Sequence, residues 1–255
     1  WLLQITDWRI VSVWLAALTV LVAAAIWLFT RNPASVPARR PTIGEQLRGT
    51  LQIVADARFW QTASLPVITG GAFYAVQSLW VGPFLREVAG ESPERAAWLV
   101  SVLGISMVAG NILLGGAARY VERAGISLYN FSGACMALYL VVQLLLVLRV
   151  PMPGELVWAA YGVFGSSSIL AYAVMAERFP YQMLGRVSTT ITLVMFLAIF
   201  LCQVGVGWIV AMWPPLAGGA YPAAAHVVAW AVLLALQAAG AVWYFWPTRR
   251  PARAA

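Results

Sequence analysis

Polar side chains in the middle of long apolar segments are the residues of this chain that could do chemistry. A polar group in lipid is costly, so it faces a cavity or a neighbouring helix. Hydroxyl and amide groups that share one helical face could bind a solute through hydrogen bonds. We expect the substrate-cavity residues to be Tyr74, Gln77, Asn111, Tyr161, Ser168, Tyr172, Thr192 and Gln203. For each one taken alone, a hydrogen bond between two helices is the alternative.

The segment Ser101–Gly125 combines a small, partly polar helical face with a charged turn. Residues on this face recur at helical spacing, which lets another helix approach closely or leaves a cavity wall. They are Ser101, Gly104, Val108, Asn111 and Gly115. The apolar run then ends in a short charged turn, which contains Arg119, Glu122, Arg123 and Gly125.

Acidic residues lie only at or beyond the ends of the apolar segments. The nine are Asp7, Glu45, Asp56, Glu87, Glu91, Glu94, Glu122, Glu155 and Glu177. We therefore expect no carboxylate at mid-membrane depth and no obvious proton carrier. One histidine and two cysteines cannot furnish a plausible zinc site, so we expect no metal and no cofactor.

Two other classes of membrane protein fit the residues poorly. An intramembrane serine hydrolase would need Ser166 or Ser168 beside His226, but the expected difference in depth is roughly 10 Å at the rise of an α-helix. We expect His226 to be a packed or interface residue and the chain to have no catalytic residues. A retinal protein needs a lysine for its Schiff base, and the chain has none.

Composition identifies an all-α membrane protein. Of the 255 residues, 62% are hydrophobic and only 10% are charged, with a mean hydropathy of +0.81. The net charge of +7 comes from arginines spread between apolar segments, so we expect a lipid bilayer and no nucleic acid as partner. Cys135 and Cys202 sit within apolar segments and are expected in the core.

Seven segments are long and apolar enough to span a membrane, which needs about 20 residues. They are Ile10–Thr30, Thr62–Leu85, Ala96–Ala118, Ser127–Leu148, Leu156–Ala176, Val187–Trp213 and Ala223–Trp246. Tryptophans near their ends are typical of aromatic belts at the two membrane surfaces. The chain begins with Trp1, and its first apolar run is long enough to span, so we expect a missing beginning and no signal peptide.

Arginine placement predicts the orientation. Twelve of the sixteen arginines fall on one side of the seven segments, and the other four are Arg9, Arg86, Arg95 and Arg149. The positive-inside rule then places the C-terminus in the cytoplasm and the start of the chain outside. We expect an integral protein of a bacterial inner membrane.

The connection at 31–61 is predicted to contain a short amphipathic helix. The prolines of this connection all lie in its first part, before Thr42. Thr42 and Glu45 then have the spacing of a capping box. An apolar stripe follows, which favours a helix lying on the cytoplasmic membrane surface. The stripe consists of Ile43, Leu47, Leu51 and Val54.

Two loops resemble those of the major facilitator superfamily. Glu122-Arg123-Ala124-Gly125 is similar to the D-R-x-G core of the family's loop motif, and Glu177 to Ser188 resembles its loop between the tenth and eleventh helices. The resemblance implies a cytoplasmic gate that closes through paired charges. The gate candidates are Glu122, Arg123, Gly125, Glu177, Arg178 and Arg186.

The long connection after the first span sets the register of this resemblance. A facilitator has twelve helices and a long cytoplasmic connection after the sixth, so the first span resembles the sixth helix. The implied domains are 1–30 (start and first span), 31–61 (linker), 62–246 (six-helix C-terminal bundle) and 247–255 (tail). The fourth and seventh spans, which are rich in leucine and alanine, are expected to face lipid.

The resemblance implies transport of a small solute by alternating access, with an N-terminal helix bundle as the missing partner. A membrane scaffold that does not transport is the alternative. It would be favoured if side chains filled the polar faces.

Overall fold

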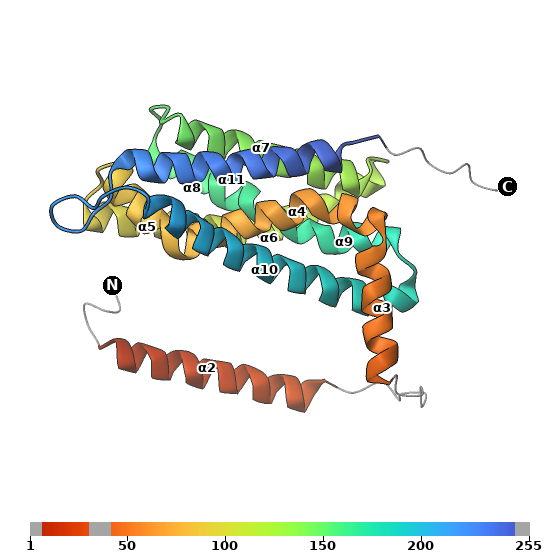
Figure 1. The fold of residues 1–255 in the computed structure, drawn as a ribbon. Coiled ribbons are helices and arrows are strands. Elements are labelled where there is room, and N and C mark those ends of the chain that lie inside the picture. Colours follow the sequence, from red (N-terminus) through yellow and green to blue (C-terminus); the bar gives the residue numbers. More distant parts are fainter. Residues whose placement is uncertain (1–6, 31–41, 248–255) are drawn as a thin grey trace. The chain divides into compact units, whose positions relative to one another are not determined.

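The structure is a computed structural model that describes residues 7–30 and 42–247 and divides into two units, 1–43 and 44–255 (Figure 1). The start of the chain, the prolines of the linker and nearly all of the tail lie outside the described residues. In the first unit, α2 (Trp8–Phe29) is a single helix of 22 residues. Its sides carry exposed apolar residues such as Trp14, Trp27 and Phe29.

The second unit consists of helices only, among the residues described. Two of its turns, η1 and η2, are π-helical, and two others, η3 and η4, are 3₁₀-helical. In order, the elements are α3 (Ile43–Ala55), α4 (Ala57–Ala75), η1 (Val76–Trp80), α5 (Val81–Pro83), η2 (Phe84–Val88), α6 (Pro93–Arg123), α7 (Leu128–Val147), α8 (Gly154–Gly165), η3 (Ser166–Ile169), α9 (Leu170–Arg178), η4 (Tyr181–Met183), α10 (Leu184–Val210) and α11 (Ala223–Tyr244).

Six helical segments of the described residues are long and apolar enough to cross a membrane, which confirms an all-α membrane protein. They are Arg9–Phe29, Pro93–Arg123, Leu128–Val147, Gly154–Arg178, Tyr181–Val210 and Ala223–Tyr244. The predicted span Thr62–Leu85 is helical but does not belong to this set. A count of seven spans therefore stays a prediction.

The weak apolar character of α4 follows from its place in the bundle. It packs against α10, α11, α9 and η3, and nearly every residue from Gln61 to Phe73 is buried. A helix enclosed by other helices needs small residues for close approach more than it needs lipophilic ones. A Cβ on Gly71 would lie 2.8 Å from the Cβ of Ala198 on α10.

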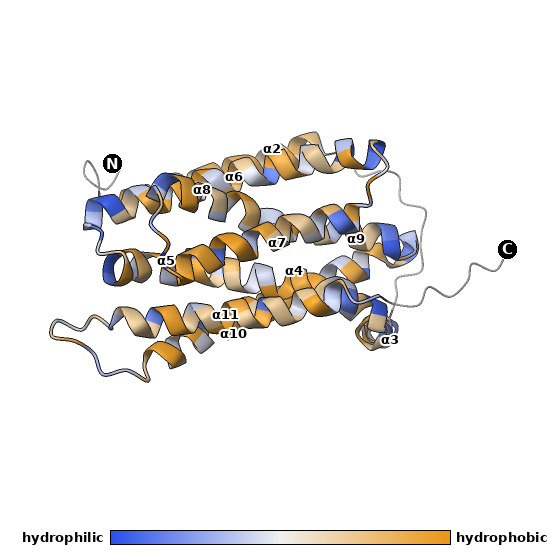
Figure 2. Cartoon of the chain, turned by 90° about the horizontal axis from the view of Figure 1, so that it is seen from above, coloured by the Kyte–Doolittle hydropathy of each residue, from blue (hydrophilic) through white to orange (hydrophobic). Residues whose placement is uncertain are grey.

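Connections alternate between two ends of the bundle, as Figure 1 shows. The α3 end contains α3 and the connections at 124–127 and 179–183. The loop end contains the connections at 89–92, 148–153 and 211–222. Hydrophilic residues gather toward the helix ends, whereas the helix bodies are largely hydrophobic (Figure 2). This pattern suits helices that cross a bilayer.

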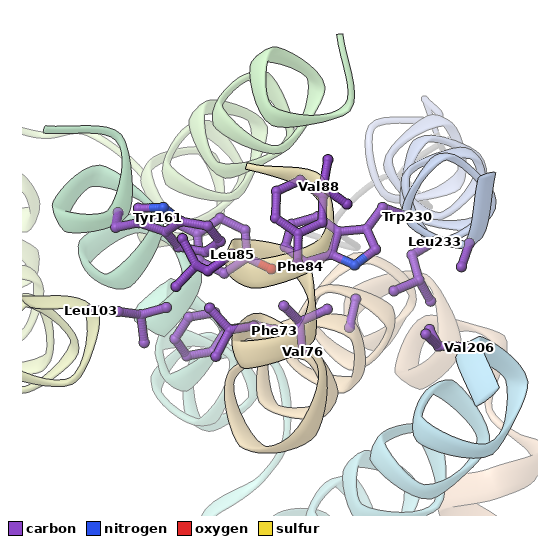
Figure 3. Packing of buried hydrophobic residues seen from close by; sticks show 14 of the residues in the cluster. Phe73, Val76, Phe84, Leu85, Val88, Leu103, Tyr161, Val206, Trp230 and Leu233 are labelled. Atoms are coloured by element: carbon purple, nitrogen blue, oxygen red, sulfur yellow. The ribbon is translucent and has the colours of Figure 1, made fainter. Parts of the chain in front are cut away.

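An aromatic core fills the centre of the bundle toward the loop end (Figure 3). Phe84 stacks on Trp230 with ring centroids 4.1 Å apart, and Trp158 meets Trp230 edge to face at 6.2 Å. Tyr139 donates a hydrogen bond to Tyr161 across 2.7 Å. Such large apolar rings bury much surface, and their hydroxyl groups need partners when buried.

The two helices that were expected to face lipid, α7 and α11, do so on one side only. Leu138 and Leu144 of α7 and Leu236 of α11 are exposed. Each helix also contributes a fully buried glutamine, Gln143 of α7 and Gln237 of α11. The Nε2 of Gln237 donates a hydrogen bond to the Oε1 of Gln143 at 2.8 Å. The expectation therefore missed a polar contact that joins these helices.

The amphipathic helix of the linker is present as α3, and it lies across the end of the bundle (Figure 1). Ile53 is buried with Phe59 and Val187, whereas Leu47 and Leu51 are exposed. Asp56 caps the next helix, α4, by accepting from the backbone N–H of Arg58 at 2.8 Å. The hydrogen bond from the Arg58 side chain lowers the pKa of this carboxyl.

Candidate functional site

A single open cavity of about 530 Å³ brings together polar residues from distant parts of the second unit. Its walls come from α4, η1, η3, α9 and α10. Six of the eight residues expected to line a cavity do line this one: Tyr74, Gln77, Ser168, Tyr172, Thr192 and Gln203. The other lining residues are Ser78, Ile169, Met195, Phe196 and Ile199.

The π-helical turn η1 shapes one wall of the cavity. In this turn the Ser78 hydroxyl donates to the carbonyl of Tyr74 at 2.7 Å. Its oxygen can then accept the hydrogen bond from Gln203 Nε2, which lies 2.9 Å away on α10. π-helical turns occur often at functional sites, because they aim side chains that an α-helix would place elsewhere.

Hydroxyl groups of α9 and α10 form another part of the cavity lining. Thr192 donates to the carbonyl of Ser188 at 2.8 Å, so its single hydrogen is already used. The Tyr172 hydroxyl, 2.9 Å from the Thr192 oxygen, must therefore be the donor of that bond. Its lone pairs remain able to accept a hydrogen bond from a molecule in the cavity.

The remainder of the lining is apolar and uncharged. Met195, Phe196 and Ile199 of α10 and Ile169 of η3 belong to this part of the lining, and Phe196 is 66% exposed. None of the described residues that line the cavity carries a charge. The arrangement can hold a molecule by apolar contact and orient it through a few neutral hydrogen-bonding groups.

Two of the predicted cavity residues lie elsewhere. Tyr161 is fully buried in the aromatic core, where its hydroxyl accepts from Tyr139. Asn111 is half-buried on α6, and its Oδ1 atom is buried without a hydrogen-bond partner among the described residues. The helical period places both on the predicted faces of their helices, but the helix rotations that turn those faces away from the cavity depend on tertiary packing.

The predicted gate residues meet at the α3 end. The carboxyl of Glu177 on α9 lies beside that of Glu122 on α6. Gly125 adopts a φ of +76°, which lets Ile126 N–H bond to the carbonyl of Val121 at 3.1 Å and end the helix. Arg123 is the last residue of that helix and is exposed.

The two other arginines that were predicted to belong to the gate contact other helices of the second unit. The guanidinium of Arg178 lies 3.9 Å from the ring centroid of Tyr129 and donates to Thr62 at 3.0 Å. Arg186 lies against Gly49 of α3, where an added Cβ would come within 2.6 Å of its Nη1. Both side chains therefore fasten helices to one another at this end.

A polar site that the sequence did not indicate lies at the loop end. His226, only 1% exposed, places its Nε2 atom 2.7 Å from the Oε2 of Glu87. The sequence offered only a weak signal for this Glu87–His226 site: a histidine near the end of the last span and an acid at the end of the second, far apart in the chain.

Ser166, which the hydrolase alternative would use, donates its hydroxyl to the carbonyl of Val163 at 2.7 Å.

A scan against protein-family models and a search of curated proteins found no match to this chain. Among the described residues, no cluster of three or more histidine, cysteine or acidic side chains could hold a metal. Fold and site together define the class: an integral, all-helical membrane protein with an uncharged cavity in its bundle.

Proposed function

We propose that this chain forms one wall of a transporter that moves a small solute across the membrane by alternating access. The observation that carries the proposal is the convergence of seven polar residues from α4, η1, η3, α9 and α10 on one open cavity. Isolated hydrogen bonds between helices would scatter such residues over several contacts. A shared cavity is what solute binding near the membrane midplane requires.

The chemistry of the lining favours a neutral solute. A charged solute would leave its charge unpaired against Met195, Phe196 and Ile199. The Tyr172 hydroxyl and the amides of Gln77 and Gln203 suit a molecule that carries hydroxyl, carbonyl or amide groups. The solute class we infer is therefore small, uncharged and partly apolar.

A second helix bundle would complete the cavity. Beside it, α10 exposes Leu193, Phe196 and Phe200, all more than half accessible. Apolar residues of this size at the rim of a polar cavity suit a partner bundle that rocks against them. If the resemblance to the facilitators holds for the whole fold, that bundle would come N-terminal to this one.

Arginine placement supports a cytoplasmic α3 end. Within the described part of the second unit, six arginines lie at this end, namely Arg48, Arg58, Arg119, Arg123, Arg178 and Arg186. Three lie at the loop end, namely Arg86, Arg95 and Arg149. The exposed leucines of α3 would then rest on the cytoplasmic surface of a bacterial inner membrane.

Cysteine accessibility in reconstituted vesicles tests whether the cavity is open to solute. In a background with Cys135 and Cys202 replaced by alanine, Gln77→Cys lies in the cavity and Gln143→Cys lies in the closed core. A water-soluble methanethiosulfonate reagent should modify Gln77→Cys about tenfold faster or more, as exposure controls thiol reactivity. Neutral solutes can then be screened for protection of this cysteine, and protecting solutes tested for uptake.

Equal, slow modification of the two cysteines would overturn the transporter proposal. It would mean that side chains or lipid fill the space, which is the property expected of a membrane scaffold. Protection by charged solutes alone would overturn the inferred solute class while leaving an accessible cavity.

A further inference from the structure

A buried histidine and a half-buried acid form a two-residue site at the loop end. Glu87 belongs to η2 and His226 to the first turns of α11, and they meet at 2.7 Å. The same Oε2 atom of Glu87 also accepts the backbone N–H of Tyr221 at 2.9 Å. This carboxyl therefore joins the 211–222 connection to α11 and to the end of the second helical run.

The hydrogen-bond pattern of the pair suits one arrangement of its protons. Two donors on one carboxylate oxygen suit an ionised Glu87 with the imidazole hydrogen on Nε2. The other ring nitrogen, Nδ1, is buried and has no partner among the described residues. A bare acceptor at Nδ1 is tolerable, whereas a second proton there would create a charged donor with nothing to accept its bond.

A second proton cannot therefore be held in the present geometry. It would convert the imidazole to imidazolium, bonded to Glu87 through Nε2 and unsatisfied at Nδ1. Water or a carbonyl has to reach Nδ1, so η2 or the 211–222 connection has to move. Glu87 itself lines a hollow of about 650 Å³ at the loop end, together with Gly218 and Tyr221, which gives protons a route in.

Other charged groups near the pair are few in the described structure. Arg86 and Glu91 line the same hollow as Glu87. Arg149, which follows α7, donates to the carbonyl of Val88, next to Glu87. The only charged residues of α4 and α10, Arg58 and Arg186, lie at the α3 end.

One π-helical turn connects this pair to the cavity. Within η1, Gln77 and Ser78 line the cavity, while the Trp80 ring lies 6.4 Å from the imidazole of His226 between ring centroids. Trp80 also covers Gly207 of α10, where an added Cβ would lie 3.3 Å from the indole. Movement of the imidazole would thus act on the segment that bonds Ser78 to Gln203.

We propose that Glu87 and His226 form a proton-binding site whose loading moves the 211–222 connection and, through η1, the cavity. Its use in solute transport rests on the function proposed above, whereas proton binding and the movement do not. The pair takes up one proton at Nδ1 and releases it there, so no other reactant is involved.

Because the chain contains a single histidine, ¹⁵N-histidine labelling of the reconstituted full chain reports on His226 alone. We expect one titration step in its ring-nitrogen shifts. Glu87→Gln should move the Nε2 resonance, because the hydrogen-bond partner of that atom changes from a carboxylate to an amide. Glu91→Gln, the control in the same hollow, should shift it far less.

Hydrogen exchange at the Tyr221 amide, corrected for the intrinsic rate at each pH, tests the movement. It should rise about tenfold as pH falls through the imidazole midpoint, since its acceptor is displaced. The modification rate of Gln77→Cys, corrected for the thiolate fraction at each pH, should change at the same pH. Wild-type Tyr221 exchange provides this readout even if Glu87→Gln fails to fold.

Three results would each overturn the proposal. One is an imidazole that does not titrate between about pH 4 and pH 10, a range that brackets the ordinary histidine. Another is a titration step that Tyr221 exchange does not follow. The third is a cavity whose Gln77→Cys reactivity is constant across the step, which would break the link to η1. Failure of the transport proposal would show separately, as a cavity closed at every pH.

Discussion

The cavity and the aromatic core use the same kinds of residue for opposite purposes. In the cavity, Gln203 bonds to Ser78 at 2.9 Å and both face open space. In the core, Gln143 and Gln237 bond at 2.8 Å and are fully buried between α7 and α11. A polar residue in a membrane helix can thus either join two helices through a buried hydrogen bond or face a cavity in which it can bind a molecule.

The difference lies in the neighbours and not in the polar residues themselves. Around the core, glycines let helices close up: a Cβ on Gly165 would lie 2.2 Å from the ring of Phe73. Around the cavity, Tyr172 of α9 and Thr192 of α10 bond to one another, but open space remains beside them. The packing of neighbouring side chains therefore decides whether a polar residue joins helices or faces a cavity, and substitutions can test this.

The largest effect is expected from emptying the core. Trp230→Ala should lower the free energy of unfolding by about 3–5 kcal/mol, because a large buried ring leaves a cavity behind. Trp208→Ala, which removes a ring that is 73% exposed on α10, should cost about 0.5 kcal/mol or less. Unfolding in mixed lipid–detergent micelles, followed by circular dichroism, measures both. Equal losses would show that the core is no more tightly packed than the surface.

The next largest difference is expected between glycines at close helix contacts and glycines in open positions. A Cβ on Gly162 of α8 would lie 2.6 Å from the backbone carbonyl of Leu103, so Gly162→Ala should cost about 1–3 kcal/mol. Gly104 of α6 has nothing within 4 Å, and Gly104→Ala should stabilise by up to about 1 kcal/mol through helix propensity. The same unfolding assay compares them. A costly Gly104→Ala would reveal a helix seated on that face.

The buried glutamines should behave as a pair. Gln237→Leu leaves the Oε1 of Gln143 without its donor and should cost about 1–3 kcal/mol. Combining it with Gln143→Leu should recover part of this loss, because an unpaired amide no longer remains in the core. Simple addition of the two losses would contradict a direct bond between them.

The smallest changes in stability are expected in the cavity. Gln203→Leu and Tyr172→Phe each remove one bond of a kind that averages about 0.6 kcal/mol within membranes, and water can replace it in an open cavity. Their effect should appear instead in solute protection of Gln77→Cys. A loss as large as that of Gln237→Leu would mean that these residues join helices too.

Much of the cavity could be predicted because it depends on local periodicity. Helical spacing puts Tyr74 on one face with Gln77, and Ser168 on one face with Tyr172, wherever their helices pack. Polar groups in apolar helices must face a cavity or a polar group of another helix. The helix ends were equally accessible, since charges, prolines and glycines mark them. Gly125, at the end of α6, is an example.

Contacts between distant segments could not be predicted in this way. Gln143 and Gln237 look like single polar residues in lipid-facing helices until α7 and α11 are brought together. Glu87 and His226 are 139 residues apart, and they meet only when η2 and α11 are brought together in the fold. Tyr161 fell on the expected face, but the rotation of α8 directs it into the core.

The two π-helical turns in one segment also bear on how this chain could change by descent. A π-helical turn closes on the fifth residue instead of the fourth, so η1 and η2 each accommodate one residue more than an α-helical turn would. Loss of one codon between Val76 and Val88 would turn one of them into an α-helical turn, so the residues on either side of it would keep nearly the same facing. Because a one-residue deletion in a regular α-helix rotates everything beyond it by about 100°, these turns are the places where the segment could gain or lose a residue without turning the cavity residues away.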